Sequence, residues 1–374
     1  MSLLSRLFGT RQERLPAALA LDLSRLRTAA TAIGEIGPKS RFKRLTDEEQ
    51  LHELNHRLGV RLSRCHPSDR VAVANVLAEA ERVLPPEVRP VTASTRALEA
   101  KSVQDKGCAD LGMGLDAAQL ADVHAHLRSK PLLLAHDAHM GTTRVASIDE
   151  VPQDQNYACY DYLDLWSSPH IIELAAHDKV LDVAQGYFGC IPTLYSINAF
   201  WSFPHRQPHP YSQVFHRDWE DYRSLVAFTL LTPVESPEEG AHYYVETSHE
   251  VDKFEETLRA GGIGPDIIAK LSERGEEIAP LAMKLFEHTA RRFDGPAGKS
   301  FCIDGYGLHR ALVPQSRPRL LLWMRFGNFF NEAAYKRPQL AGDRALAQGI
   351  LRRIPNTPRH QYIFRYLIQA LVAV

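Results

Sequence analysis

The stretch Gln213-Val-Phe-His216-Arg-Asp218-Trp-Glu-Asp-Tyr222 places a histidine and an aspartate two residues apart in an aromatic and apolar setting. In an extended strand, side chains at positions i and i+2 project from the same face, so His216 and Asp218 would share one side of the chain. A third side chain can join them from a later strand, because His309 follows the apolar run Phe301-Cys-Ile303 and a glycine-containing turn. Two histidines and one carboxylate are the ligands typical of non-haem iron(II) sites that keep coordination positions open.

The context makes this metal-site prediction more specific than the triplet alone. A His-X-Asp triplet is a weak signal, because a chain with 17 histidines should contain roughly one by chance. Here a second histidine follows near a glycine turn, and an arginine follows in the next predicted strand. A structural zinc site would be closed, usually by thiolates, and the stretch around His216 has none. We therefore predict an open iron site formed by His216, Asp218 and His309.

Runs rich in Tyr, Phe, Val, Ile and Trp, separated by Pro/Gly turns, dominate the chain after Ile191. The predicted strands span residues 193–203, 213–216, 223–231, 241–246, 299–303 and 319–326. Helices precede them: Asp116 is a good N-cap, and a helix over 169–188 would end at Gly189, a common C-terminal signal. This order predicts an α+β fold with a double-stranded β-helix core, a jelly-roll or cupin-like barrel flanked by helices.

The domain organisation follows from where these patterns change. Residues 1–104 are predicted to form a mostly helical N-terminal extension, with an Ala/Leu-rich helix at 72–80, and no residues there suggest chemistry. Residues 105–335 are predicted to form the iron domain. A helical insertion at 250–293 interrupts its strands, where either a substrate-contacting lid or a cover for a sheet edge is expected. Residues 336–374 are predicted to form a C-terminal helical segment.

Composition narrows the cellular setting and the partners. The formal net charge is -1 and the pI is near 7.0, which favours neither nucleic acid nor an anionic membrane as a partner. Five scattered cysteines without a CxxC pair indicate neither a disulfide framework nor a zinc knuckle. No segment approaches the roughly 18 apolar residues of a membrane helix. We expect a soluble cytoplasmic protein that acts on a small molecule, and nothing in the sequence indicates its oligomeric state.

The charge at the N-terminus differs from that of the whole chain. Residues 1–45 contain nine Lys/Arg and three Asp/Glu, a local excess of six positive charges. A solvated basic face is the simpler interpretation. The alternative is that this region recruits the protein to a partner or a membrane surface.

Several blocks of the sequence resemble the phytanoyl-CoA dioxygenase family of iron(II)/2-oxoglutarate oxygenases. The resemblance covers roughly residues 105–330 and rests on Gly114 to Leu134, the FHRDWEDYR block, Gly240 to His249, and Gly295 to Asp304 leading to His309. In the third block, Glu246-Thr247 replaces the usual Pro-Gly of the family. The resemblance implies that His216, Asp218 and His309 bind Fe(II), and that 2-oxoglutarate and O2 are co-substrates. It also implies that Phe228 lies beside the 2-oxoglutarate pocket.

The resemblance further implies a basic residue, about ten positions after the distal histidine, that binds the far carboxylate of 2-oxoglutarate. Arg310 follows the ligand His309 in the strand and should face outward, while Arg317 lies in the Ser-Arg-Pro entrance to the last strand. Arg325 shares a face with Arg319 but lies too far along for the family spacing. Arg319 is therefore the predicted residue, and a register slip of one would favour Arg317 instead.

Aromatic residues are dense around the first two ligands, and most of them should fill a barrel. Trp201 and Trp219 are the candidates for contacting substrate. His205 and His209 lie in a proline-rich segment and are interpreted as surface-loop histidines rather than as a second metal site.

The resemblance implies hydroxylation of an aliphatic C–H bond of a small molecule, with release of succinate and CO2. Desaturation or epimerisation by the same chemistry stays open, because these outcomes depend on how the substrate is placed. The alternative from another class is a cupin-like metal-binding or scaffold protein without catalytic turnover.

Overall fold

The computed structural model describes residues 17–36, 48–62, 65–79, 97–136, 139–204, 212–272, 278–328, 340 and 342–374. Its strands are β1 (Cys108–Met113), β2 (Leu132–His136), β3 (His139–Val145), β4 (Tyr157–Cys159), β5 (Thr193–Ser202), β6 (Ser224–Leu230), β7 (His242–Tyr244), β8 (Arg291–Phe293), β9 (Lys299–Asp304), β10 (His309–Ala311) and β11 (Arg319–Gly327). They form two antiparallel sheets. The larger has the order β1-β9-β6-β11-β5-β4-β2-β3, and the smaller has the order β10-β7-β8.

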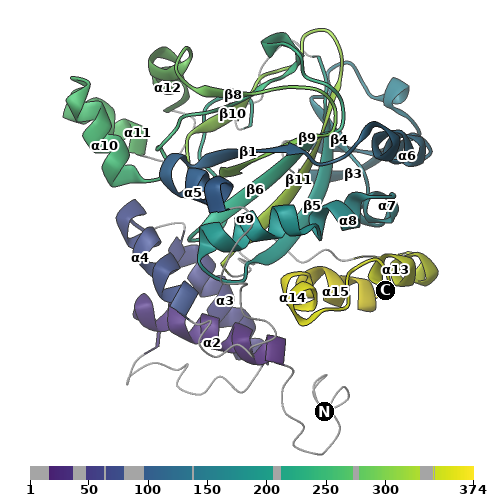
Figure 1. The fold of residues 1–374 in the computed structure, drawn as a ribbon, viewed down its shortest axis with the longest axis horizontal. Helices are drawn as coiled ribbons and strands as arrows, with labels where there is room; N and C mark the ends of the chain where they lie inside the picture. Colours follow the sequence, from purple (N-terminus) through teal and green to yellow (C-terminus); the bar gives the residue numbers. More distant parts are fainter. Residues whose placement is uncertain are drawn as a thin grey trace, which may run out of the picture.

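Helices surround these sheets. They are α2 (Ala17–Ala32), α3 (Glu48–Leu62), α4 (Pro67–Ala78), α5 (Ala97–Lys106), α6 (Ala117–Arg128), α7 (Tyr162–Ser167), α8 (Ile171–Ala175), α9 (Asp178–Phe188), α10 (Val251–Ala260), α11 (Pro265–Ser272), α12 (Ile278–Phe286), α13 (Arg344–Leu351), α14 (Pro358–Ile363) and α15 (Arg365–Val372). In Figure 1, α10 to α12 lie at one end of the molecule beside the small sheet, and α2 to α4 lie at another. The helices α7 to α9 and α13 to α15 lie along the large sheet.

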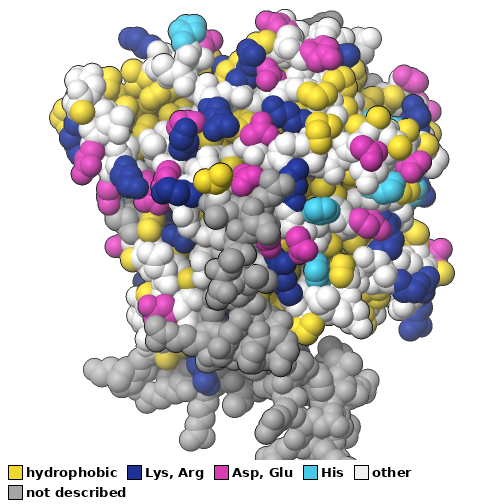
Figure 2. All heavy atoms as spheres, in the orientation of Figure 1, with side chains coloured by type: hydrophobic (Ala, Val, Ile, Leu, Met, Phe, Trp, Pro, Cys, Tyr) yellow, Lys and Arg dark blue, Asp and Glu magenta, His cyan; other side chains and the backbone are white. Residues whose placement is uncertain are grey.

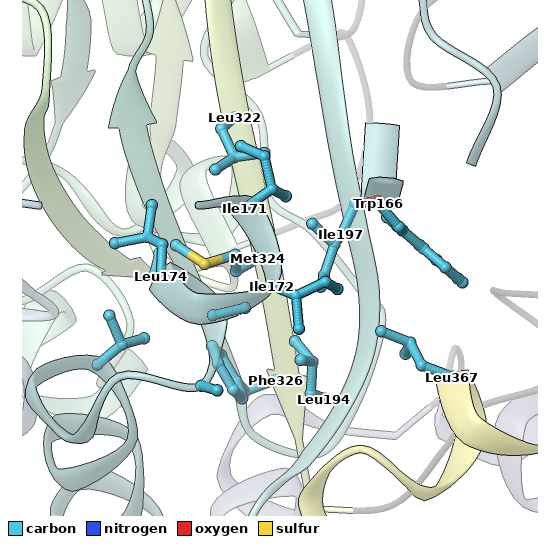
Figure 3. Packing of buried hydrophobic residues seen from close by; sticks show 14 of the residues in the cluster. Trp166, Ile171, Ile172, Leu174, Leu194, Ile197, Leu322, Met324, Phe326 and Leu367 are labelled. Carbon is cyan, nitrogen blue, oxygen red and sulfur yellow. The ribbon is translucent and has the colours of Figure 1, made fainter. Parts of the chain in front are cut away.

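Alternation along β11 separates the two faces of the large sheet. Leu320, Leu322, Met324 and Phe326 belong to the main hydrophobic core, under the helices. Figure 3 shows Leu322, Met324 and Phe326 packed with side chains from β5 and from α7, α8 and α15. Burial of each such side chain contributes about 1.5–3 kcal/mol relative to exposure. The intervening residues of β11 therefore point the other way, toward the small sheet.

The space between the two sheets contains a second, mostly aromatic core. Phe228 of β6 and Phe301 of β9 stack with ring centroids 5.0 Å apart, and Phe293 of β8 stacks on Phe301 at 4.5 Å. Leu321 of β11 and Tyr244 of β7 belong to the same buried cluster. This core holds the small sheet against the large one, and the candidate site lies beside it.

The predicted mixture of helices and antiparallel strands is confirmed, with corrections. Asp116 caps α6 as predicted, and Gly189 ends α9 in the left-handed conformation with φ of 65°. The single helix predicted over 169–188 was wrong, because the chain breaks at His177, which caps α9. The strand predicted at 213–216 was also wrong, since only His216 forms a bridge there. The strands β1 to β4 were not predicted.

The described surface carries mixed charge. Acidic and basic side chains are interspersed over the face shown in Figure 2, in keeping with a formal net charge of -1. Within the described residues, no helix is long and apolar enough to cross a membrane.

The N-terminal helices are attached to the rest of the molecule through buried contacts. Apolar residues of α2, α3 and α4 form one cluster, and Tyr222, from the segment that follows the candidate ligands, is part of it. Arg25 of α2 is 1% exposed. Its guanidinium donates hydrogen bonds of 2.6 Å to the carbonyl oxygens of Ile191 and Asn328, next to the ends of β5 and β11. Arg25 is thus part of the buried structure, whereas Arg27 is exposed. The other seven basic residues of 1–45 lie outside the described residues.

Replacing Arg25 with alanine should lower the free energy of unfolding by about 2–4 kcal/mol, because two buried hydrogen bonds from a charged donor are lost. Urea denaturation measures this change. Arg27→Ala is the matched control, since Arg27 is exposed on the same helix and should change stability by less than about 0.5 kcal/mol. Equal effects of the two substitutions would contradict this account of Arg25.

Candidate metal centre

Backbone hydrogen bonds bring the two halves of the candidate site together. The N–H of His216 donates to the carbonyl of His309 at 3.0 Å, and the N–H of His309 donates to the carbonyl of His216 at 3.1 Å. The N–H of Asp218 donates to the carbonyl of Gly305 at 2.8 Å. The segment around His216 follows turns and bends, so this bridge, and not strand alternation, determines which way the side chains point.

The three predicted ligands converge. Nε2 of His216 lies 3.7 Å from Oδ1 of Asp218, and Nε2 of His309 lies 3.7 Å from Oδ2 of the same carboxylate. The imidazole centroids are 4.2 Å apart. One ligand atom from each of these side chains lies within 4.8 Å of the others, which is close enough for one ion to bind all three.

The hydrogen bonds of the imidazoles suit metal binding. Nδ1 of His216 lies 2.8 Å from the carbonyl oxygen of Val214, and Nδ1 of His309 lies 2.8 Å from that of Gly307. A carbonyl can only accept, so Nδ1 carries the hydrogen in both rings and Nε2 keeps a free lone pair. Burial, reinforced by the neighbouring His216, holds the pKa of His309 well below its usual value. His309 is therefore neutral, the form that binds metal.

The four arginines are in different environments. Arg317 is exposed and forms an ion pair of 2.6 Å with Glu239. Arg310 faces away from the ligands, as expected, and lies over the ring of Phe215 with its guanidinium 4.9 Å from the centroid. These two positions leave only Arg319 and Arg325 on the face of β11 that looks toward the small sheet.

Arg319 differs from Arg325 in having no acidic partner among the residues that the structure describes. Arg325 pairs with the buried Glu220 at 3.3 Å. Arg319 is 4% exposed and donates to the carbonyl of Gly240 and, at 3.1 Å, to the hydroxyl of Ser202. Within the described residues it forms no ion pair, and burial lowers its pKa to about 10. A buried guanidinium in this state favours an anion from outside the chain.

A wall of aromatic side chains lies beside the ligands. Phe228 is in this wall, with its centroid 4.8 Å from the ring of His242, and His242 stacks on His309 at 5.7 Å with an interplanar angle of 14°. The sequence analysis did not assign His242 a role. The only signal was its place in the block Gly240 to His249, since alternation in β7 turns His242 and Tyr244 inward together.

The two candidate tryptophans lie on opposite sides of the large sheet. Trp201 packs against the helix-covered core, and its Nε1 donates to the hydroxyl of Tyr160 at 3.0 Å. Trp201 thus lies on the face of the sheet that the helices cover, and its contact with substrate stays an untested prediction. Trp219 adjoins Asp218 and meets Tyr306 edge-on at 4.9 Å, so it stays a candidate. His205 and His209 lie outside the described residues.

Arg217, between the candidate ligands His216 and Asp218 in sequence, connects this segment to two other loops. It is buried, and Nη1 donates to the carbonyls of Ser248 at 2.6 Å and Tyr306 at 2.8 Å. Two guanidiniums lie near the ring of Tyr306: that of Arg70 in α4 is 3.5 Å from the ring centroid, and that of Arg217 is 5.1 Å from it. Thr247, which precedes Ser248, has φ of 68°. Glycine, the residue that the family pattern has at this position, adopts this conformation more readily than threonine does.

A cavity of about 470 Å³ lies where the predicted insertion meets the small sheet. Its lining residues are Gln213, Val214, Ala279, Pro280, Met283, Arg310, Leu312, Val313 and Gln315. Because none of the three candidate ligands lines it and Arg310 points away from them, this cavity lies on the outer side of the small sheet.

No family model matches the chain, and no curated protein matches it. Membership of the phytanoyl-CoA dioxygenase family thus stays a prediction. Solved structures with distant similarity include the non-haem α-ketoglutarate-dependent epimerase SnoN from nogalamycin biosynthesis, at 17% identity over 61% of this chain and 79% of that chain, with a TM-score of 0.40. EctD from S. alaskensis with bound Fe has 16% identity over 68% of this chain and 88% of that chain, with a TM-score of 0.42.

A third solved structure is HygX from Streptomyces hygroscopicus with nickel and 2-oxoglutarate bound. It has 14% identity over 63% of this chain and 87% of that chain, with a TM-score of 0.39. Similarity this distant does not decide the activity of this chain, which has to be argued from its own residues.

Proposed function

We propose that this protein is an iron(II)/2-oxoglutarate-dependent dioxygenase that hydroxylates an aliphatic C–H bond of a small molecule. One observation carries the proposal: a two-histidine, one-carboxylate cluster lies in the same inter-sheet region as a buried arginine that has no acidic partner in the part of the chain that the structure describes. The cluster suits a divalent ion with open positions, and the arginine suits the far carboxylate of a chelating dicarboxylic acid. The large and small sheets would then be the two sheets of a double-stranded β-helix.

Each residue has a definite part in this proposal. His216, Asp218 and His309 would hold the ion, and their Nδ1 hydrogen bonds to backbone carbonyls keep both imidazoles oriented toward it. Arg319 would bind and orient the co-substrate. Phe228 would line that pocket and exclude water. Trp219 would face the substrate next to Asp218. When bound, iron(II) and 2-oxoglutarate would supply the O2-dependent oxidation that releases succinate and CO2.

Succinate release tests the proposal. Purified protein supplied with iron(II), 2-oxoglutarate and air should form succinate slowly even without the prime substrate. Removing the metal with a chelator should stop the reaction, and adding iron(II) back should restore it. If the protein binds iron but neither binds 2-oxoglutarate nor forms succinate, the alternative of a cupin-like metal-binding or scaffold protein without catalytic turnover is favoured instead. Product analysis with a turned-over substrate then distinguishes hydroxylation from desaturation or epimerisation.

A further inference from the structure

His242 is a buried polar side chain of the small sheet. It lies on β7, is 6% exposed, and neither of its ring nitrogens has a partner within the described part of the chain. A buried imidazole in this state is unfavourable, because its donor and its acceptor have both lost water without replacement. Phenylalanine or leucine would fill the same space without that cost, so packing alone does not account for a histidine here.

The surroundings of His242 indicate what could reach it. Its ring stacks on His309 at 5.7 Å, and its other close rings are Phe228 at 4.8 Å and Phe301 at 5.6 Å. Two residues before it, the carbonyl of Gly240 accepts a hydrogen bond from Arg319. The same short segment thus contacts both the candidate metal ligand and the candidate carboxylate-binding arginine.

Two simpler roles fit less well. His242 is not among the side chains whose ligand atoms lie within 4.8 Å of one another, so it is not a fourth member of the metal cluster. The Nδ1 of His309 already bonds to the carbonyl of Gly307, and within the described residues neither ring nitrogen of His242 bonds to His309. His242 therefore does not orient His309 through a hydrogen bond, as a supporting residue of a metal site would.

We infer that His242 donates a hydrogen bond to a carboxylate oxygen of the 2-oxo acid co-substrate. This inference rests on the proposed function. A dicarboxylic 2-oxo acid that chelates the metal and reaches Arg319 passes the segment Gly240 to His242, and it brings only oxygen acceptors. A neutral imidazole offers one N–H donor of the right kind. His242 is thus a second co-substrate-binding residue, in addition to Arg319. Arg319 attracts the carboxylate by its charge, and the hydrogen bond from His242 helps to set the orientation of the co-substrate.

Anaerobic titration of 2-oxoglutarate into the iron(II)-loaded protein tests this inference without relying on turnover. His242→Leu should raise the Kd for 2-oxoglutarate about tenfold or more, the size expected for a hydrogen bond to a charged group. The Kd for iron(II) should change by less than about twofold, since no metal ligand is removed. His242→Gln, which keeps a donor, should recover part of the affinity. Tyr243→Phe is the matched control, because Tyr243 faces the other side of β7, toward the insertion helices.

The outcomes separate the inference from the proposed function. If the wild-type protein loaded with iron(II) does not bind 2-oxoglutarate, both are overturned. If the wild type binds it and His242→Leu binds it equally well, only the role of His242 is overturned. Should His242→Leu fail to fold, the wild-type imidazole still gives an answer: its ring N–H resonance, followed by NMR in zinc-loaded protein, should shift when 2-oxoglutarate is added. An unchanged resonance would also overturn the role.

Discussion

Replacing Asp218 with alanine should give a folded protein that no longer retains iron. The substitution removes the carboxylate that lies 3.7 Å from the Nε2 atom of each imidazole, and it leaves only the two histidines as ligands. Loss of a residue that only supports a metal ligand typically weakens metal binding by about 10–100-fold, so loss of a ligand itself should exceed about 100-fold. The measurements are iron content after gel filtration and an anaerobic iron(II) titration. Succinate formation should disappear together with the bound metal.

A control separates this effect from a general loss of negative charge. Asp122 is largely exposed and pairs with His170 at 3.0 Å, far along the chain from the ligands. Asp122→Ala should leave iron binding and succinate release unchanged. Iron retention by Asp218→Ala at the wild-type level would show that the convergence of these three side chains is not a metal site, and the proposed function would fail with it.

Replacing Arg319 with methionine should weaken the binding of 2-oxoglutarate much more than it changes the stability of the protein. Removing one partner of a buried charge pair costs about 2 kcal/mol or more in affinity, so the Kd for 2-oxoglutarate should rise roughly 30-fold or more. In the absence of co-substrate, however, Arg319 is a buried cation that has no acidic partner among the described residues. An apolar side chain of similar length removes the cost of burying that charge, but it also removes the hydrogen bonds to Gly240 and Ser202, so the free energy of unfolding should change by less than about 2 kcal/mol. Anaerobic titration and urea denaturation measure the two effects separately.

Arg325→Met should do the reverse: it should destabilise the protein strongly and leave the affinity for 2-oxoglutarate nearly unchanged. Its guanidinium is paired with Glu220, which also accepts a 2.5 Å hydrogen bond from Tyr195. Removing Arg325 leaves that buried carboxylate without its cation, which should destabilise the protein by about 3–5 kcal/mol. The affinity for 2-oxoglutarate should be nearly unchanged in the fraction that folds. If the two variants exchanged these patterns, Arg325 rather than Arg319 would be the co-substrate residue.

The convergence of the three candidate ligands could be predicted from sequence, although the local structure around His216 was not. Two ligands two residues apart remain neighbours in many backbone conformations, so His216 and Asp218 came together even without the expected strand. The partner His309 was recognisable because it begins a strand after an apolar run. The short strands before residue 160 were missed, because β4 has only three residues and β2 and β3 form an outlying hairpin of the large sheet.

Other positions depend on which face of a sheet is covered, and sequence does not give this. Alternation correctly places Phe200 and Trp201 on opposite faces of β5, but only the packing of the helices shows that Trp201 faces the core. The choice of Arg319 over Arg317 likewise needed the burial of one and the exposed ion pair of the other. A lone histidine such as His242 looks like an ordinary core residue until the absence of its hydrogen bonds is seen among the described residues.

The paired backbone hydrogen bonds between His216 and His309 have a consequence for metal selectivity. These bonds fix the backbone that carries both imidazoles. If the three side chains bind a metal as proposed, they present the same arrangement of two nitrogens and one carboxylate to any divalent ion of suitable size. Cobalt, nickel and copper bind nitrogen and oxygen donors more tightly than iron(II) does, following the Irving–Williams order. Three fixed ligands do not exclude these ions by their geometry. Which ion occupies the site would then be decided by the metals that the cell makes available while the chain is folding.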